Sequence, residues 1–129
     1  MINTNVWDYV DVLGKAADAS WLKNEAISNN IANVDTPNYN RQDVDFEDAL
    51  RQALLKNSYI SLDDKIDALD LSDLDVEVYT DYSDYAYRLD GNNVDIDTEN
   101  VSLAENQLVY QGLTDSISQE LSRLEDVCK

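Results

Sequence analysis

The chain is 129 residues long, so it suits a single domain with a modest core if much of it forms extended helices. Its 27 acidic and 9 basic residues give a formal net charge of −18, which repels nucleic acid phosphates and anionic lipid headgroups. No stretch approaches the roughly 20 apolar residues of a membrane span, and no basic and apolar signal opens the chain. We therefore expect no nucleic acid partner, no direct membrane insertion and no Sec signal.

A seam with the spacing of a coiled coil begins near the N-terminus. Residues recur at alternating intervals of four and three at Val6, Val10, Leu13, Ala17, Ser20, Asn24, Ile27, Ile31 and Val34. The pattern predicts a helix over about 6–33, which ends before Pro37 because the residue preceding a proline is disfavoured in helical conformation. Small and polar residues weaken the middle of this seam, so the helix needs packing partners.

A tight reversal is expected directly after this helix. In Thr36-Pro37-Asn38-Tyr39, proline presets φ at the second turn position, and asparagine tolerates the positive φ that a type II turn needs at the third. Beyond the turn, Phe46, Leu50 and Leu54 recur at helical spacing. They predict a short amphipathic helix over about 46–56.

The middle of the chain is strongly acidic. Between residues 59 and 98 it holds twelve acidic and two basic residues, which contribute −10 to the net charge of −18. Val76, Val78, Thr80 and Tyr82 partly alternate with charged residues. We therefore expect this segment to be irregular or to form short strands.

Helical spacing returns in the C-terminal part of the chain. A second seam runs through Leu103, Gln107, Tyr110, Thr114, Ile117, Leu121, Leu124 and Cys128. It predicts a helix over about 98–126, capped by Asp97 or Thr98. We expect a mainly α fold in which the long N- and C-terminal helices pair as an antiparallel coiled-coil-like bundle. The chain is thus divided into segments 1–58, 59–97 and 98–129, with the acidic one between the two helical ones.

The residue types that common catalysis requires are scarce. The chain has no histidine, and its one cysteine, Cys128, has no imidazole to activate it, so zinc and nucleophilic chemistry are poor candidates. Paired carboxylates such as Asp95 with Asp97, or Asp63 with Asp64, have the composition of a glycoside hydrolase pair, but a solvated acidic surface explains them better. We expect no enzyme, no cofactor and no metal site.

The run Asp-Gly-Asn-Asn-Val-Asp-Ile-Asp at 90–97 contains the oxygen ligands that calcium prefers. In an EF-hand loop glycine stands sixth and glutamate twelfth, whereas here glycine is second and Val101 is twelfth. We favour a turn in which Gly91, Asn92 and Asn93 accept positive φ ahead of the last helix.

Two runs of the sequence resemble a known family. The first, Asn29-Asn30-Ile31-Ala32-Asn33-Val34-Asp35-Thr36-Pro37-Asn38-Tyr39-Asn40-Arg41, is similar to the N-terminal signature of flagellar rod and hook axial proteins, N-x-A-N-x-x-T-P-G-Y followed by a basic residue. Asn38 replaces the signature's glycine, and asparagine is the next best residue for positive φ. On this resemblance, the motif residues are Asn30, Ala32, Asn33, Thr36, Pro37 and Tyr39.

The second run extends from 90–95 through Glu99 to 103–111 and resembles the C-terminal half of the proximal rod proteins of that family. The short middle favours a proximal rod subunit, because hook and distal rod proteins carry large inserted domains. The resemblance implies a structural subunit that is exported by the flagellar type III apparatus and stacks helically into the basal-body rod to transmit torque. It implies other rod subunits, rod-base proteins and the export gate as partners, and a location in the cell envelope outside the cytoplasmic membrane.

Two sets of residues are predicted to serve this role. Phe46 and Leu50 match the short motif that the resemblance assigns to recognition by the export gate, although any small amphipathic helix would bury such residues too. Subunit packing is predicted to use the seams, at Val10, Leu13, Ile27, Ile31, Leu103, Tyr110, Ile117, Leu121 and Leu124.

An acidic helical adaptor or export chaperone, acting as a soluble binding partner, is the alternative hypothesis because it would share the heptads and the low isoelectric point. Loss of the rod on deletion of the chain, with the chain absent from wild-type basal bodies, would favour the adaptor. A two-carboxylate enzyme is a more distant alternative, which requires two of the acidic residues of 63–97 to converge in a pocket.

Overall fold

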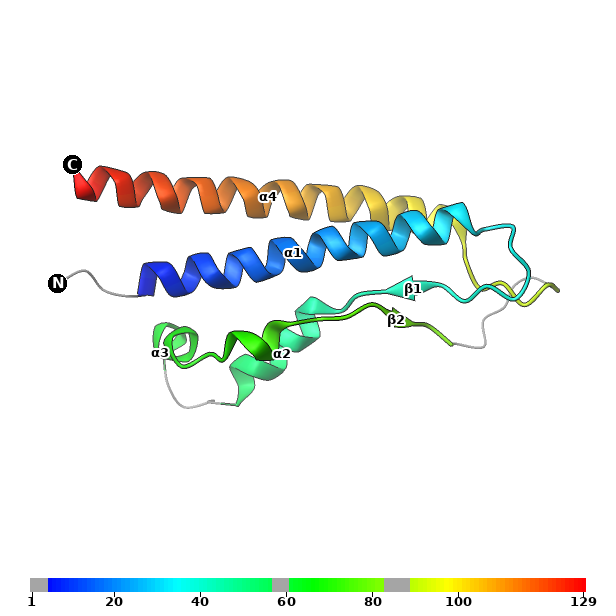
Figure 1. Ribbon diagram of the computed structural model, residues 1–129, viewed down its shortest axis with the longest axis horizontal. Coiled ribbons are helices and arrows are strands. Elements are labelled where there is room, and N and C mark those ends of the chain that lie inside the picture. Colours follow the sequence, from blue (N-terminus) through cyan, green and yellow to red (C-terminus); the bar gives the residue numbers. More distant parts are fainter. Residues whose placement is uncertain (1–4, 57–60, 83–88) are drawn as a thin grey trace. The chain divides into compact units, whose positions relative to one another are not determined.

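A computed structural model describes residues 5–56, 61–82 and 89–129 (Figure 1). The elements follow in the order α1 (Asn5–Ala32), β1 (Gln42–Asp43), α2 (Phe46–Leu55), α3 (Leu62–Asp67), the 3-10 turn η1 (Leu71–Leu74), β2 (Tyr79–Thr80) and α4 (Ile96–Cys128). The fold is mainly helical, with a long helix near each end of the chain and short strands in an irregular middle, as predicted. No described helix is both long and apolar enough to cross a membrane.

The C-terminal helix begins two residues earlier than predicted, because the cap is Asp95 rather than Asp97 or Thr98. The Asp95 Oδ1 atom accepts hydrogen bonds from the backbone amides of Asp97 at 3.0 Å and Thr98 at 3.4 Å. The Asp95 carbonyl also accepts from the Glu99 amide at 2.9 Å, which is the first helical bond. A carboxylate at this position satisfies free amides and interacts favourably with the positive end of the helix dipole.

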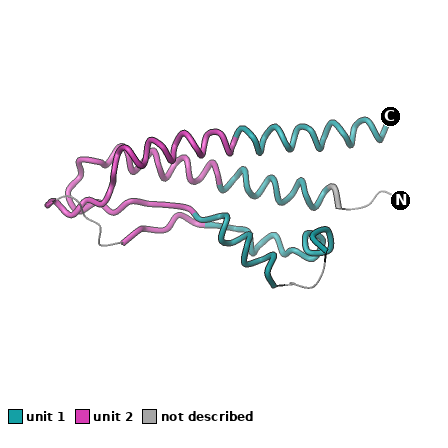
Figure 2. The backbone as a smooth tube through the Cα atoms, turned by 180° about the vertical axis from the view of Figure 1, so that it is seen from behind, with its two compact units in different colours: residues 1–19, 45–76, 111–129 teal, residues 20–44, 77–110 magenta. Residues whose placement is uncertain are grey.

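The chain forms two compact units, and each long helix contributes to both (Figure 2). Unit 1 comprises residues 1–19, 45–76 and 111–129, and unit 2 comprises residues 20–44 and 77–110. Unit 1 therefore contains the start of α1, the helices of the middle and the end of α4. Unit 2 contains the end of α1, both strands and the start of α4.

A small apolar cluster forms the core of unit 1. Val12 of α1, Ala53 of α2, Ile66 of α3 and Leu74 of η1 are buried in it. The partly buried residues packed around them are Tyr9, Phe46, Leu50, Leu54, Leu69 and Leu71. The predicted amphipathic face of α2 is therefore the face that packs in this cluster.

In unit 1, the acidic side chains of Asp8 and Asp67 lie close together, and their negative charges repel each other at neutral pH. A hydrogen bond with Asp8 is the main cause that raises the pKa of Asp67, followed by desolvation and by the charges of Asp8, Asp64 and Asp63. An acid whose pKa is higher in the folded than in the unfolded chain makes folding more favourable as the pH falls through that raised pKa. We expect Asp67→Asn to raise the midpoint of urea unfolding at pH 7 and to have no effect below the ordinary aspartate pKa.

The control for this prediction is Asp115→Asn, because Asp115 is exposed on α4 and its substitution changes the net charge by the same amount. If both substitutions raise the midpoint equally at pH 7, the stabilisation reflects total charge and not the Asp8–Asp67 pair. Unfolding curves at several pH values, followed by far-UV circular dichroism, distinguish the two.

In unit 2 the end of α1 and the start of α4 run antiparallel. Asn30, near the end of α1, contacts Glu99 in the first turn of α4, whereas Ser20, earlier on α1, contacts Asn106, later on α4. Ser20 Oγ donates to Asn106 Oδ1 at 3.0 Å, and Asn106 Nδ2 donates to the Ser20 carbonyl at 2.8 Å. The predicted antiparallel pairing of the terminal helices is confirmed by these contacts.

The two strands of unit 2 form a short antiparallel ladder in which Gln42 lies opposite Thr80 and Asp43 lies opposite Tyr79. The Asp81 amide donates to the Arg41 carbonyl at 2.8 Å and extends the pairing beyond β2. Glutamine and aspartate are poor strand formers, so the position of β1 depends on polar side chains around it.

Candidate functional site

Two chain reversals of unit 2, one in each signature run, are hydrogen-bonded to each other. In the first, Asn38 has a φ of 60° and the Tyr39 amide donates to the Thr36 carbonyl at 3.3 Å, which confirms the predicted turn. In the second, Gly91 has a φ of 77°. The Asn38 amide donates to the Asp90 carbonyl at 2.8 Å, so the backbone itself joins the two reversals.

The asparagines of the second reversal act through their side chains. Among the described non-glycine residues only Asn38 has a positive φ, so the expectation of positive φ at Asn92 and Asn93 is wrong. Asn92 is 1% exposed, and its Nδ2 atom donates to the carbonyls of Asn33, Val34 and Thr36 at 2.9, 3.0 and 2.9 Å. These three residues follow the end of α1 at Ala32, so Asn92 bonds to the segment that leaves this helix from far along the chain.

Replacing Asn92 by alanine is expected to cost about 1–3 kcal/mol of unfolding free energy, because the buried Val94 amide loses its acceptor Asn92 Oδ1 at 2.8 Å and three carbonyls lose a donor. Asn100→Ala is the matched control, since Asn100 is exposed on α4 and alanine is the better helix former. Urea unfolding followed by tryptophan fluorescence measures both. Equal midpoints for the two variants would show that water replaces the Asn92 amide at no cost.

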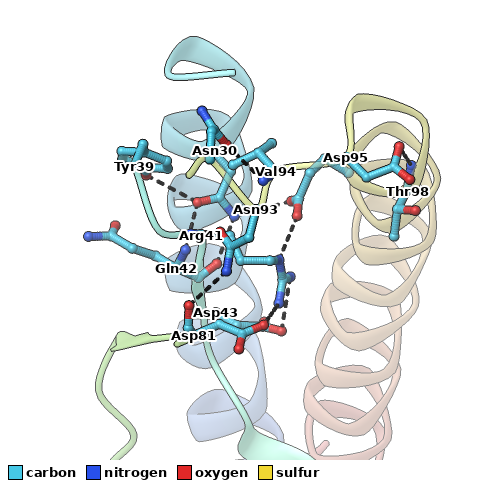
Figure 3. A network of polar contacts seen from close by, with 12 residues as sticks. Asn30, Tyr39, Arg41, Gln42, Asp43, Asp81, Asn93, Val94, Asp95 and Thr98 are labelled. Atoms are coloured by element: carbon cyan, nitrogen blue, oxygen red, sulfur yellow. Dashed lines mark hydrogen bonds and ion pairs between the residues drawn. The ribbon is translucent and has the colours of Figure 1, made fainter. Parts of the chain in front are cut away.

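Asn30, the first motif residue, is fully buried at 0% exposure and is hydrogen-bonded through both ends of its amide (Figure 3). Its Nδ2 donates to the Gln42 carbonyl at 2.7 Å, and its Oδ1 accepts from the Gln42 amide at 2.7 Å, as a neighbouring strand would do. Oδ1 also accepts from Tyr39 Oη at 3.1 Å, and Nδ2 donates to Glu99 Oε2 at 3.2 Å. One side chain thereby fastens the end of α1 to both β1 and α4.

Arg41 connects β1, the end of β2 and α4 through one guanidinium (Figure 3). Nε donates to Glu99 Oε1 at 2.8 Å, Nη1 to Asp81 Oδ2 at 3.0 Å, and Nη2 to Asp43 Oδ2 at 3.2 Å. The Arg41 amide donates to Asn93 Oδ1 at 2.7 Å, and Asn93 Nδ2 donates to the Asp81 carbonyl at 2.9 Å. We call the connected residues, together with the neighbouring Asn92, the signature network: Asn30, Tyr39, Arg41, Asp43, Asp81, Asn92, Asn93 and Glu99.

Arg41 and Tyr39 of the signature network both keep their protons at neutral pH. Burial alone would lower the pKa of Arg41, but hydrogen bonds to Glu99 and Asp81 and the charges of Glu99 and Asp43 outweigh it and raise that pKa. Burial, followed by the Glu99 charge, raises the pKa of Tyr39. Arginine and tyrosine already titrate well above pH 7, so neither side chain exchanges a proton there. The arrangement suits a mechanical role, because its polar groups form hydrogen bonds and ion pairs with one another.

Three of the four carboxylates considered for catalysis, Asp95, Asp63 and Asp64, make structural contacts. Asp95 caps α4. Asp63 accepts a hydrogen bond from Tyr9 Oη at 2.6 Å, and Asp64 accepts one from Ser61 Oγ at 2.8 Å. Within the described part of the chain, no three histidine, cysteine, aspartate or glutamate residues are grouped to hold a metal ion.

The other motif residues lie at the end of α1 and in the turn. Asn33 Nδ2 donates to the Asn29 carbonyl at 2.8 Å, and Thr36 Oγ1 donates to Asn33 Oδ1 at 3.1 Å. Ala32 and Pro37 are exposed. Thr36 is exposed as well, so the motif combines buried and half-buried residues with three that face solvent.

Phe46 and Leu50, the predicted export-gate residues, are partly buried against the apolar cluster of unit 1. This packing is what any short amphipathic helix would show, so recognition by the gate stays a prediction. The exposed Cys128 ends α4.

The predicted seams are buried to different degrees. Ile27 is 1% exposed, whereas the half-buried members are Val10, Leu13, Ile31, Leu103, Ile117 and Leu124. Leu121 is 45% exposed, and Tyr110, at 36%, lies with its ring centroid 6.0 Å from that of Trp21. The buried residues of α4 are Glu99 and Asn106, so polar pairs occupy the α1–α4 contact. Subunit packing through these seams stays a prediction.

Six members of the signature network were not predicted as site residues: Arg41, Asp43, Asp81, Asn92, Asn93 and Glu99. Two signals in the sequence point to them. Arg41 is a cation at the end of the first signature run in a chain with few cations, and Asn92, Asn93 and Glu99 belong to the second run. The pairing between the runs is long-range and has no local pattern.

Comparison with known proteins decides the family. A family model described as flagella basal body rod protein matches residues 13–40, which include most of the first signature run. The chain is 37% identical over 120 residues to the flagellar basal body rod protein FlgB of Bacillus subtilis, covering 89% of this chain and 88% of that protein. The chain belongs to the FlgB family of flagellar basal body rod proteins.

Further FlgB proteins extend this similarity. The FlgB of Borrelia hermsii is 40% identical over 114 residues, covering 81% of this chain and 84% of its own length. The FlgB of Salmonella typhimurium is 34% identical over 101 residues, covering 71% and 72%. The resemblance seen in the two signature runs is thus confirmed, and these relatives do not favour the adaptor or chaperone hypothesis. In this FlgB-family chain, the signature network is the contact between the two runs.

Proposed function

We propose that this rod protein is a structural subunit of the proximal rod, exported by the flagellar type III apparatus and assembled helically to transmit torque. The observation that carries the proposal is the signature network, in which buried polar groups of both signature runs are paired. Such a network holds its elements in one geometry, because each unpaired buried group would cost free energy. A subunit that transmits torque needs this kind of rigidity, and we propose no catalytic role.

The proposed partners are other rod subunits and the proteins at the rod base, and the proposed location is the cell envelope outside the cytoplasmic membrane. Family membership supports both. A deletion strain tests the proposal directly: we expect no rod in its purified basal bodies, and the chain itself in basal bodies of the parent strain. Rods of normal length in the deletion strain would overturn the proposal.

We further propose that the export gate reads Phe46 and Leu50 while α2 is unpacked. Both side chains are partly buried against the unit 1 cluster, so a gate reaches them only when α2 leaves that cluster. Export of an unfolded or loosened chain satisfies this requirement.

Secretion assays with alanine variants test the gate motif. Phe46→Ala is expected to reduce secretion, whereas Leu54→Ala is the matched control, because Leu54 packs against the same cluster but lies outside the motif. Cytoplasmic levels of each variant are measured alongside. Equal secretion of the two variants would show that these residues act only in the core.

A further inference from the structure

The start of α4 carries a row of residues that faces away from its buried side. This outer row consists of Asp97, Val101, Glu105, Leu108 and Gly112, which recur at helical spacing. Val101 is 58% exposed and Leu108 is 71% exposed. Each stands two residues, or about 200° around the helix, from the buried Glu99 and Asn106 respectively. Val101 and Leu108 are therefore exposed apolar side chains on the side of α4 opposite its buried residues.

The acidic members of the outer row are also without partners. Asp97 and Glu105 are exposed, and neither forms an ion pair with a described residue. The sequence from 96 to 112 contains no lysine or arginine. A Cβ added at Gly112 would meet no atom within 4 Å, so another backbone has room to approach there.

A second copy of this chain is a poor complement for the outer row. Each copy has a net charge of −18, so two copies repel each other. Seven of its nine cations already contact carboxylates of their own chain: Lys15, Lys23, Arg41, Arg51, Lys56, Arg123 and Lys129. Few cations are thus available to face the acidic residues of another copy.

We propose that the outer row of α4 docks a basic helix of an unlike chain. Apolar residues of that helix cover Val101 and Leu108, and its lysines or arginines face Asp97 and Glu105. Charge complementarity favours this partner, because unlike charges across an interface promote encounter and like charges oppose it. The inference names the kind of neighbour for the assembly proposed above and rests on that function.

The test uses the full chain and a synthetic amphipathic helical peptide with a leucine face flanked by lysines, with binding measured by titration calorimetry. Leu108→Ser is expected to weaken binding about tenfold or more, because it removes the apolar surface that one leucine side chain would bury in the complex. Leu55→Ser is the matched control, because Leu55 is 62% exposed on α2 and neither substitution changes the charge. A peptide with glutamates in place of lysines is expected not to bind.

Two results would overturn the inference. One is equal binding of the lysine peptide to Leu108→Ser and Leu55→Ser, which would mean that only net charge attracts it. The other is a dimer of the chain in sedimentation velocity that Leu108→Ser abolishes, which would make a second copy the occupant. The deletion experiment is independent, since rods in the deletion strain overturn the proposed function whatever the peptide does.

Discussion

Replacing Arg41 by alanine is expected to destabilise the protein by about 3–5 kcal/mol, the usual cost of removing one partner of a buried ion pair. The cause is Glu99, whose side chain is 1% exposed and would lose its Nε contact at 2.8 Å. Asp81 and Asp43 lose the same cation. A small domain has only about 5–15 kcal/mol of total stability, so this loss is a large fraction. Urea unfolding followed by Trp21 fluorescence measures it within unit 2.

Two further variants separate the buried charge from general effects of losing an arginine. Arg51→Ala removes an arginine that is 67% exposed and pairs with Asp48 one helical turn away, so we expect a change below about 0.5 kcal/mol. The double variant Arg41→Ala with Glu99→Gln removes both charges and is expected to recover part of the loss. If the double variant is no more stable than Arg41→Ala alone, the cost does not arise from the unpaired Glu99 charge.

Replacing Asn30 by alanine is expected to cost about 2–4 kcal/mol, because several groups lose their hydrogen-bond partner at once. The Gln42 amide and carbonyl each lose a bond of 2.7 Å, and Tyr39 Oη loses its acceptor. Asn30→Asp has nearly the same shape but places a carboxylate beside Glu99, so it should destabilise the protein further. Unfolding free energies of both variants are compared with the parent chain.

Asn29→Ala is the control for these variants, because Asn29 precedes Asn30 on the same helix and is exposed. Alanine has the higher helix propensity, so this substitution is expected to be neutral or slightly stabilising. A loss of stability at Asn29 equal to that at Asn30 would mean that the end of α1 responds to any change, and that the hydrogen bonds of Asn30 are not the cause.

The long helices and the first turn were predictable because their signals are local and repeated. Heptad spacing indicated α1 and α4, and the proline and asparagine of the turn indicated the positive φ at Asn38. β1 was not predictable, since Gln42 and Asp43 have no strand propensity and are placed by Asn30 and the partner strand. Hydrophobic spacing also predicted the wrong contact residue in α4. It placed Gln107 in the seam, but Gln107 is exposed and its neighbour Asn106 is buried.

The signature network escaped prediction for a related reason. Asn92 bonds to carbonyls of the segment after α1 across more than fifty residues of sequence, and no local pattern indicates this pairing. Family resemblance drew attention to both signature runs, but it did not reveal that Arg41 and Glu99 are their contact. Polar pairing between residues far apart in the sequence becomes visible only in the folded structure.

Each unit is assembled from stretches that are far apart in the sequence, and the first residues of α1 and the last of α4 are both in unit 1. In the export proposed above, unit 1 is complete only when both ends of the chain have emerged, and unit 2 only when residues 20–110 have emerged. Glu99 and Arg41 are separated in sequence by 58 positions, so a half-translocated chain holds its guanidinium without its buried carboxylate. If the chain is exported as proposed, the order of its elements along the polypeptide disfavours folding before export is finished.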